Sequence, residues 1–176
     1  MNPIKVTLNS TQLALAKVIG DRRMAGAVAR GYKNKAGLVS EGWGEHYLGA
    51  EGELAFSVGT GVPWPMTVDT FSEPDFPPDV DIKTRGWSLT RRGVDLCQLL
   101  VRPESNPEYR YVHVVGTEGD YLIRGWAWGS EVMRREYLCN PKSKKDPKAP
   151  PRPPMFAMPN HLLRPLDELV RDGRIL

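Results

Sequence analysis

The residues best suited to chemistry lie in the segment Pro78-Asp79-Val80-Asp81-Ile82-Lys83. Side chains alternate between the two faces of a β-strand, so a strand here would place Asp79, Asp81 and Lys83 on one face. Two carboxylates beside an ammonium group suit a hard divalent cation and a water molecule that must lose a proton. The pattern therefore predicts a metal-dependent phosphodiesterase site. The alternative is a solvated strand face that carries an ion pair.

A helix upstream of this segment could supply a third carboxylate. The predicted helix covers Trp43 to Val58 and contains Gly49-x-x-Gly52-Glu53. Glycine costs a helix roughly 1 kcal/mol against alanine, and a glycine tolerated there often marks the close approach of another backbone. We therefore expect this helix to lie across the strand that carries Asp81. Glu53 is the favoured ligand and Glu51 is the alternative, because residues two apart on a helix point about 200° away from each other.

The charges are segregated along the chain, although the net charge is only +3. Residues 1–40 hold seven basic side chains against one acid, residues 41–83 hold nine acids against one lysine, and residues 84–176 hold sixteen basic side chains against eleven acids. An acidic centre between basic flanks suits a metal site that must also accept a polyanion. Chance segregation in a short chain is the alternative.

Composition indicates one soluble globular domain over residues 1–176, with 40% hydrophobic and 26% charged residues. No apolar run reaches the roughly 20 residues that cross a bilayer, and the first residues have no apolar segment of the secretory type. We therefore expect no membrane partner. The two cysteines, Cys97 and Cys139, are too few for a disulfide framework and lack a C-x-x-C spacing. A reducing, cytoplasmic setting is expected.

The periodicity of apolar residues predicts an α/β (α+β) domain, in which helices pack on a mixed sheet. Residues 102–110 are a poor helix candidate, so we expect the sheet to continue there directly as a hairpin. Residues 140–154 are rich in proline and lysine and predict a flexible arm, favoured as an ordinary solvated loop over a nucleic-acid contact. Besides the helix described above, the predicted helices are Ser10 to about Arg30, Ser130 to Tyr137 and His161 to Asp172, and the predicted strands are Met66–Thr70, Val80–Thr84, Asp95–Val101, Tyr109–Val115, Tyr121–Ala127 and Met155–Met158.

A helix glutamate followed by a strand bearing P-D and D-x-K resembles the PD-(D/E)XK nuclease superfamily, which has the restriction-endonuclease-like fold. The resemblance rests on Gly49-x-x-Gly52-Glu53 and Pro78-Asp79-x-Asp81-x-Lys83, and it covers roughly residues 41–101. The chain also resembles small phage and bacterial members that carry a later Gly-Trp motif, here Gly125-Trp126. The resemblance implies a mixed β-sheet flanked by helices, with a metal site at the sheet edge under the second helix.

Members of that superfamily bind one or two Mg²⁺ ions through the helix glutamate, the two strand acids and the carbonyl after the second acid. The resemblance therefore implies that Glu53, Asp79, Asp81 and the backbone of Ile82 hold Mg²⁺ or Mn²⁺. It implies that Lys83 orients or deprotonates the attacking water and that these side chains together hydrolyse DNA phosphodiester bonds. RNA as the substrate and a homodimer as the assembly stay open, and the implied setting is a bacterial or phage-infected cell.

One departure from the family pattern concerns the first acid, which usually lies well upstream of the D-x-K. Here Asp79 is only two residues before Asp81, so Asp69 and Asp75 also compete for this role. We favour Asp79, because the two prolines before it could kink the strand entrance and turn its carboxylate inward. The close spacing also supports a rival class, a nuclease-like domain that binds nucleic acid or a protein partner without cutting. A small structural or regulatory phage protein is the third class.

Several further residues have both a functional and an ordinary interpretation. Arg85, Arg91 and Arg92 follow the motif and could bind a phosphate, whereas a basic surface loop is about equally consistent with them. The three histidines have no spacing expected of a zinc site. Cys97 alternates with apolar residues and is expected to be buried.

Overall fold

A four-stranded mixed sheet forms the centre of the protein. Its strands are β1 (Ile4–Thr7), β2 (Val80–Gly86), β4 (Arg110–Thr117) and β5 (Asp120–Trp128). Their order is β1-β5-β4-β2, with β2 parallel to β4 and the other neighbours antiparallel. The predicted α/β (α+β) class and the β4–β5 hairpin are confirmed. Among the described residues β2 lies at the edge of this sheet, and it carries Asp81 and Lys83.

The computed structural model describes residues 3–31, 42–68, 73–89, 93–139 and 153–176. Asp69, Arg91 and Arg92 lie outside these residues, as does the predicted arm except for its last two residues. The first described segment, β1, was not predicted from the sequence. It pairs with β5 from Ile4↔Ile123 to Thr7↔Asp120.

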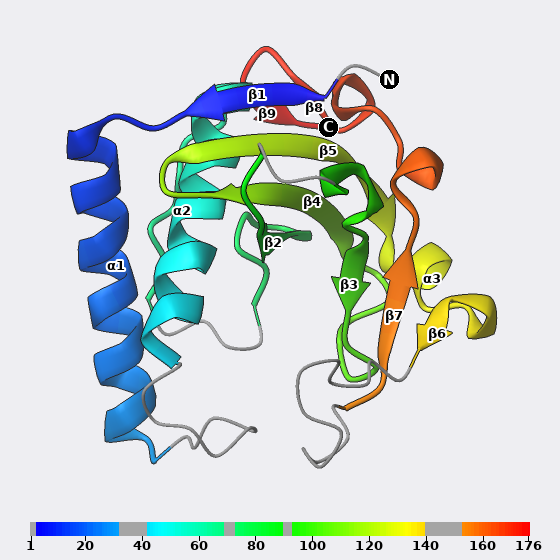
Figure 1. Cartoon of the computed structure of the whole chain (residues 1–176), viewed down its shortest axis with the longest axis horizontal. Coiled ribbons are helices and arrows are strands. Elements are labelled where there is room, and N and C mark those ends of the chain that lie inside the picture. Colours follow the sequence, from blue (N-terminus) through cyan, green and yellow to red (C-terminus); the bar gives the residue numbers. More distant parts are fainter. Residues whose placement is uncertain (1–2, 32–41, 69–72, 90–92, 140–152) are drawn as a thin grey trace.

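Two long helices lie side by side on one face of the sheet (Figure 1). They are α1 (Ser10–Ala29) and α2 (Gly42–Thr60), and both confirm the predicted helices within a few residues. Asn9 caps α1, since its side chain accepts from the Gln12 backbone N–H while the Gln12 side chain accepts from the Asn9 N–H. The helix α2 packs against the sheet, and α1 packs against α2 (Figure 1).

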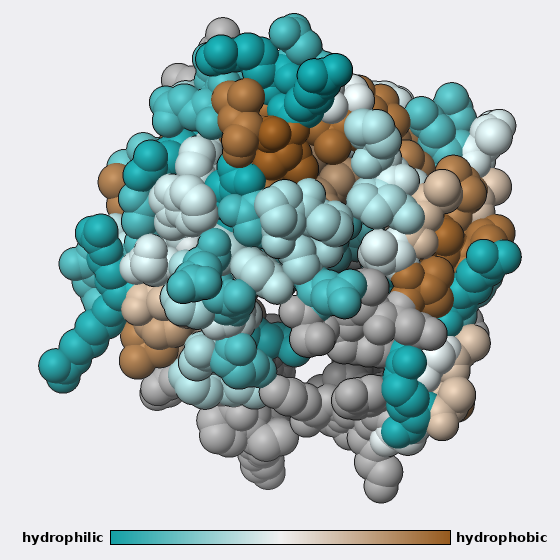
Figure 2. All heavy atoms as spheres, turned by 180° about the vertical axis from the view of Figure 1, so that it is seen from behind, coloured by the Kyte–Doolittle hydropathy of each residue, from teal (hydrophilic) through white to brown (hydrophobic). Residues whose placement is uncertain are grey.

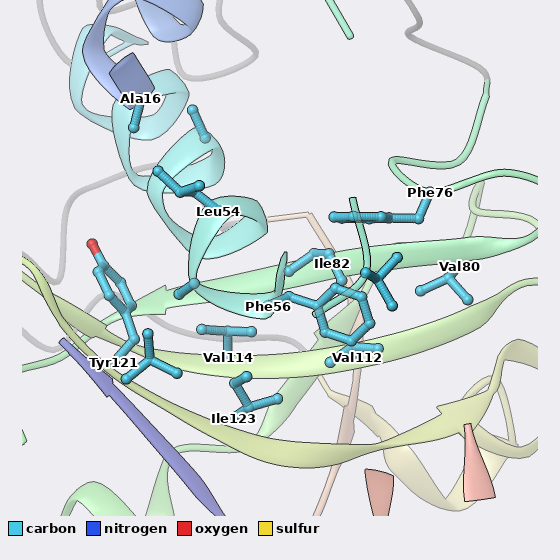
Figure 3. Close-up of a cluster of buried hydrophobic side chains, with 14 of the residues drawn as sticks. Ala16, Leu54, Phe56, Phe76, Val80, Ile82, Val112, Val114, Tyr121 and Ile123 are labelled. Atoms are coloured by element: carbon cyan, nitrogen blue, oxygen red, sulfur yellow. The ribbon is translucent and has the colours of Figure 1, made fainter. Parts of the chain in front are cut away.

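The strand β4 is buried on both faces, and its side chains, which alternate between these faces, divide the core into two parts. Val112 and Val114 point toward α2, where they meet Leu54 and Phe56 (Figure 3). Tyr111 points to the opposite face and belongs to a second buried cluster with β3 and β7. The side of β2 that carries Ile82 faces α2 in the same way as Val112, its register partner.

A second, smaller sheet covers the opposite face of β4. It is antiparallel, in the order β3-β7-β6, with strands Leu99–Val101, Met155–Met158 and Leu138–Cys139 respectively. The predicted strand Asp95–Val101 is therefore only partly confirmed, because a 3₁₀ turn at Val94–Leu96 precedes β3. The predicted strand Met66–Thr70 is wrong over residues 66–68, which are irregular.

The predicted helix His161 to Asp172 is wrong. In its place are 3₁₀ turns at Asn160–Leu162 and Leu166–Glu168, followed by the hairpin of β8 (Val170–Arg171) and β9 (Arg174–Ile175). The physical reason is Pro165, which removes a helical N–H donor and keeps the residue before it extended. The predicted helix Ser130 to Tyr137 is also shortened, to α3 (Gly129–Val132) and a 3₁₀ turn at Arg135–Tyr137.

The surface seen from behind is largely hydrophilic, with hydrophobic side chains gathered in separate patches (Figure 2). Within the described ranges, no helix combines the length and the apolar character that crossing a bilayer requires.

Candidate functional site

The helix α1 contributes a charged side chain to the site because it crosses α2 closely at Gly20. A Cβ atom on Gly20 would lie 2.4 Å from Cδ1 of Tyr47, so a larger residue would push the helices apart. Three residues further along α1, the Arg23 guanidinium reaches the Glu53 carboxylate. Its Nη1 and Nη2 donate to Oε1 and Oε2 at 2.5 and 2.7 Å. This bidentate pair was not predicted from the sequence.

The helix α2 crosses β2 at Gly52, immediately before Glu53. A Cβ atom on Gly52 would lie 1.9 Å from Oγ1 of Thr84 on β2, whereas one on Gly49 would meet nothing within 4 Å. The close approach predicted from the glycine spacing is therefore confirmed at Gly52, where the neighbour is a side chain. Glu53 is buried in the process and is only 3% exposed.

A chain reversal brings Asp75 alongside β2. Phe76 and Val80 exchange both backbone hydrogen bonds, at 2.9 and 3.0 Å, so the chain doubles back just before β2 begins. As a result Asp75 Oδ2 accepts a hydrogen bond from the Ile82 backbone N–H at 2.8 Å. The Asp75 carboxyl also shares a hydrogen bond with the carboxyl of Asp81.

The same reversal sets Asp75 beside the helix. Phe76 packs edge-on against Phe56 of α2 with ring centroids 4.9 Å apart, and Phe56 lies one helical turn from Glu53. Burial, together with the negative charges of Glu53 and Asp81, raises the pKa of Asp75 well above its usual value. We call Glu53, Asp75 and Asp81 the acidic cluster.

Glu53 is neutralised by donors from two other segments. Besides the two bonds from Arg23, Trp64 Nε1 donates to Glu53 Oε2 at 3.0 Å. The Nε and Nη2 of Arg23 also donate to the Thr67 backbone carbonyl, at 2.9 and 2.8 Å. Burial alone would lower the pKa of Arg23, but the Glu53 carboxylate more than offsets this and the pKa is raised. Arg23 is therefore a permanent, largely buried cation that contacts the acidic cluster at Glu53.

Lys83 is the basic side chain that contacts the acidic cluster at Asp81. Its Nζ lies 2.6 Å from Asp81 Oδ2 and 5.3 Å from the centroid of the Tyr111 ring. Tyr111 is the register partner of Asp81 on β4. The Lys83 side chain is 32% exposed, twice the exposure of Asp81, so Lys83 is the more solvent-accessible partner of this ion pair.

Asp79, the favoured first acid of the motif, has a different partner. Its two carboxylate oxygens accept from Nε and Nη2 of Arg110, at 2.9 and 2.5 Å, and Arg110 Nη1 also donates to the Leu176 carbonyl. The side-chain interactions shown for Asp79 are thus with Arg110 and not with the acidic cluster. Asp75, which competes with Asp79 for the role of first acid, is the residue that lies beside Asp81.

Glu51 and Glu53 also differ in their hydrogen-bond partners. Glu51 accepts a hydrogen bond from the hydroxyl of Tyr121 on β5, so Glu53 is the α2 acid of the cluster. Arg85, the candidate phosphate ligand, lies further along β2 and is half-buried.

Two buried residues have ordinary roles in the core. His113 is fully buried, its Nδ1 lies 2.9 Å from Asn160 Oδ1, and burial lowers its pKa to about 3. The predicted burial of Cys97 is confirmed.

The carboxylate oxygens of the acidic cluster can be compared with the ligands that a divalent cation requires. No group of three or more histidine, cysteine, aspartate or glutamate side chains in the described part of the chain is arranged to hold a metal ion. Arg23 occupies both oxygens of Glu53, which leaves Asp75 and Asp81 as adjacent hard oxygen donors next to Ile82. Mg²⁺ commonly uses one or two carboxylates together with water and phosphate oxygens. The residues present fit that mode of binding.

Two features of the site differ from the sequence-based interpretation. The dipeptide Pro74-Asp75 is itself a P-D, and five residues separate it from Asp81-x-Lys83. That spacing was the available signal for Asp75. For Arg23, by contrast, thirty residues separate the guanidinium from Glu53, and no local pattern marks the pairing.

Comparison with known proteins found no relative of this chain. No family model, no curated protein and no solved structure matches it, so its function is argued from the residues described above.

Proposed function

We propose that this protein is a metal-dependent nuclease that hydrolyses DNA phosphodiester bonds with Mg²⁺ or Mn²⁺. The observation that carries the proposal is the position of Asp75, which the Ile82 backbone N–H holds at 2.8 Å beside Asp81, with Lys83 Nζ at 2.6 Å from Asp81 Oδ2. Two adjacent acids are costly for a fold, and a divalent cation would remove that cost. The order P-D, five residues, D-x-K also agrees with the resemblance to the PD-(D/E)XK superfamily.

Each residue has a definite role in this proposal. Asp75 and Asp81 would hold the cation with the carbonyl of Ile82, and Asp75 would give up its proton to do so. When bound, the cation would make a coordinated water more acidic and offset the charge that develops on the phosphoryl group. Lys83 would orient the attacking water and donate to a phosphoryl oxygen. Arg85, further along the same strand, would bind a neighbouring phosphate.

The second candidate is a nuclease-like domain that binds nucleic acid without cutting it. The pairing of Glu53 with Arg23 favours this candidate, because it removes one carboxylate from the acidic cluster. In either case we propose a reducing, cytoplasmic setting, consistent with free Cys97 and Cys139.

Cleavage of linear, circular and single-stranded DNA, and of RNA, tests the proposal. We expect cutting with Mg²⁺ or Mn²⁺, none with EDTA, and none by Asp81→Ala. Glu51→Gln is the matched control, because Glu51 is an acid of the same helix outside the acidic cluster, and it should cut normally. A folded protein that binds DNA and never cuts it would support the second candidate instead.

A further inference from the structure

A β-bulge in β5 brings Arg124 into the wall of a groove that the proposed function does not use. The β4–β5 register changes from His113↔Gly125 to Val114↔Ile123, so Arg124 is the extra residue of the bulge. Bulges often redirect a side chain toward a functional surface. The groove has a volume of about 730 Å³, and the residues that line it are separate from the acidic cluster. We propose that it binds an oxyanion joined to an apolar group, either an organic carboxylate or a phosphate monoester.

The turn before β3 and the turn after β7 form the groove beside Arg124. Because β3 and β7 pair antiparallel, these two turns lie at the same end of the second sheet (Figure 1). Asn160 ties them together, since its Nδ2 donates to the carbonyls of Asp95 and Cys97 at 3.0 and 2.7 Å. Its Oδ1 lies 2.9 Å from Nδ1 of the buried His113. These contacts use both ends of the Asn160 amide, so Asn160 holds the wall in place and Arg124 is the group suited to bind a ligand.

The ion pair of Arg124 shows how an oxyanion would be held. Both Nη1 and Nη2 donate to Asp95 Oδ1 at 2.9 Å. The Arg124 side chain is only 11% exposed, whereas that of Asp95 is 82% exposed. A pair whose acid lies in water contributes little free energy, so another oxyanion can replace Asp95 at small cost. The planar guanidinium would then donate to a carboxylate or a phosphate in the same way.

Leu96 supplies the apolar contact of the groove. It follows Asp95 in the same turn and is 82% exposed, more than any other large hydrophobic residue in the described part of the chain. Pro3 and Pro159 line the same groove. A ligand that covers Leu96 while Arg124 holds its charge would gain free energy from both contacts. An inorganic anion would gain from Arg124 alone.

The test is calorimetric titration of the full chain in EDTA, so that the proposed cation site takes no part. The probes are phenyl phosphate and phenylacetate, beside inorganic phosphate and acetate. We expect the probe with a ring to bind roughly tenfold more tightly than the matching anion without one, because it covers apolar surface. The tighter of the two ring-bearing probes identifies the oxyanion as a phosphate or a carboxylate.

Four variants separate the contacts of the tighter probe. Asp95→Asn removes the competing carboxylate and should bind the probe roughly fivefold more tightly. Glu108→Gln makes the same change of net charge at an exposed acid outside the groove and should bind like the wild type. Arg124→Gln should bind roughly tenfold or more weakly, because it loses charge-assisted hydrogen bonds. Leu96→Ala should weaken the ring-bearing probes and leave the inorganic anions unchanged.

Asp95 and Leu96 are exposed, so their variants should fold like the wild type and carry the test if Arg124→Gln does not fold. An unchanged or weaker affinity of Asp95→Asn, or an equal gain in Glu108→Gln, would overturn the assignment of the site to Arg124. Absence of binding by every probe would overturn the site itself. Neither result bears on the nuclease proposal, because the groove shares no residue with the acidic cluster.

Discussion

Asp79 and Asp81 stand two residues apart, yet their surroundings are opposite. Asp79 precedes β2 and has both oxygens bonded to Arg110. Asp81, within β2, meets another carboxyl group, that of Asp75, and balances it only with the partly exposed Lys83. Asp79 is matched charge for charge by Arg110, whereas Asp81 lies beside a second carboxyl group whose pKa its negative charge helps to raise.

Under the proposed function, this difference separates a structural acid from a functional one. A paired, largely buried carboxylate and guanidinium hold two segments together, and removing either partner leaves an uncompensated charge. Adjacent acids do the reverse: they cost the folded state free energy and become favourable only when a cation arrives. The sequence motif contains both kinds of aspartate, and only their partners tell them apart.

The largest expected effect is the loss of cleavage in Lys83→Ala. Removing a group that orients or deprotonates water should slow cleavage by roughly a hundredfold to ten-thousandfold, with DNA affinity nearly unchanged. The measurement is single-turnover cleavage beside a DNA-binding titration. Arg85→Ala is the matched control on the same strand, and it should weaken binding and reduce its salt dependence. Wild-type cleavage by Lys83→Ala would remove Lys83 from the mechanism.

The next largest effect is on the free energy of unfolding and concerns the ion pair of Asp79 and Arg110. Arg110→Leu leaves Asp79 without its partner and should lower the free energy of unfolding by about 3 kcal/mol. Arg110→Lys keeps the charge, loses the two-pronged bond and should cost less. Urea unfolding gives both values. Cleavage per folded molecule should stay at the wild-type level, and a selective loss of cleavage would place Asp79 in the site after all.

The sequence predicted the elements of the site better than their connections. Periodicity located α1, α2 and the β4–β5 hairpin, and the D-x-K located the edge strand β2. These are local properties, fixed by side-chain spacing within one element. In the second sheet, β7 was predicted with its observed bounds and β3 was predicted too long. The strand β6 and the turns after Pro159 were not predicted, because a two-residue strand has too few residues for a period.

The acids of the site were likewise recognised as candidates from the sequence, but their contacts were not. Glu53 was distinguished from Glu51 only by its partner in space, and Asp75 from Asp79 only by the reversal between Phe76 and Val80. A reversal depends on backbone hydrogen bonds that residue types alone do not specify.

A substitution at Gly52 should displace the acidic cluster without changing its charges. Gly52→Ala puts a Cβ 1.9 Å from Thr84 Oγ1, so α2 must shift away from β2, at a cost of about 2 kcal/mol of overpacking. Gly49→Ala, in the same helix with nothing within 4 Å, should instead stabilise the protein by about 0.8 kcal/mol. Thermal unfolding of the two variants checks the opposite signs. Cleavage should fall only in Gly52→Ala, because only that change displaces Glu53.

A smaller effect on stability than that of Arg110→Leu, and one of opposite sign, should be the gain in Asp75→Asn. The pKa of Asp75 is raised in the folded protein by burial and by Glu53 and Asp81. Its contribution to stability is therefore full below the ordinary aspartate pKa and is lost as the pH rises through the higher folded value. Asparagine keeps the oxygen that accepts from Ile82 and has no proton to lose, so at neutral pH it should stabilise the cation-free protein by about 1 kcal/mol.

Urea unfolding between pH 4 and pH 8 in EDTA measures this gain, which should grow as the pH rises. Asp79→Asn is the matched control with the opposite sign: it takes the charge from a carboxylate that Arg110 requires and should lower stability across the same range. Asp75→Asn should also abolish cleavage, because it removes a proposed ligand of the cation. A variant that is destabilised at neutral pH would mean that Asp75, like Asp79, is a structural acid, and the contrast between the two would fail.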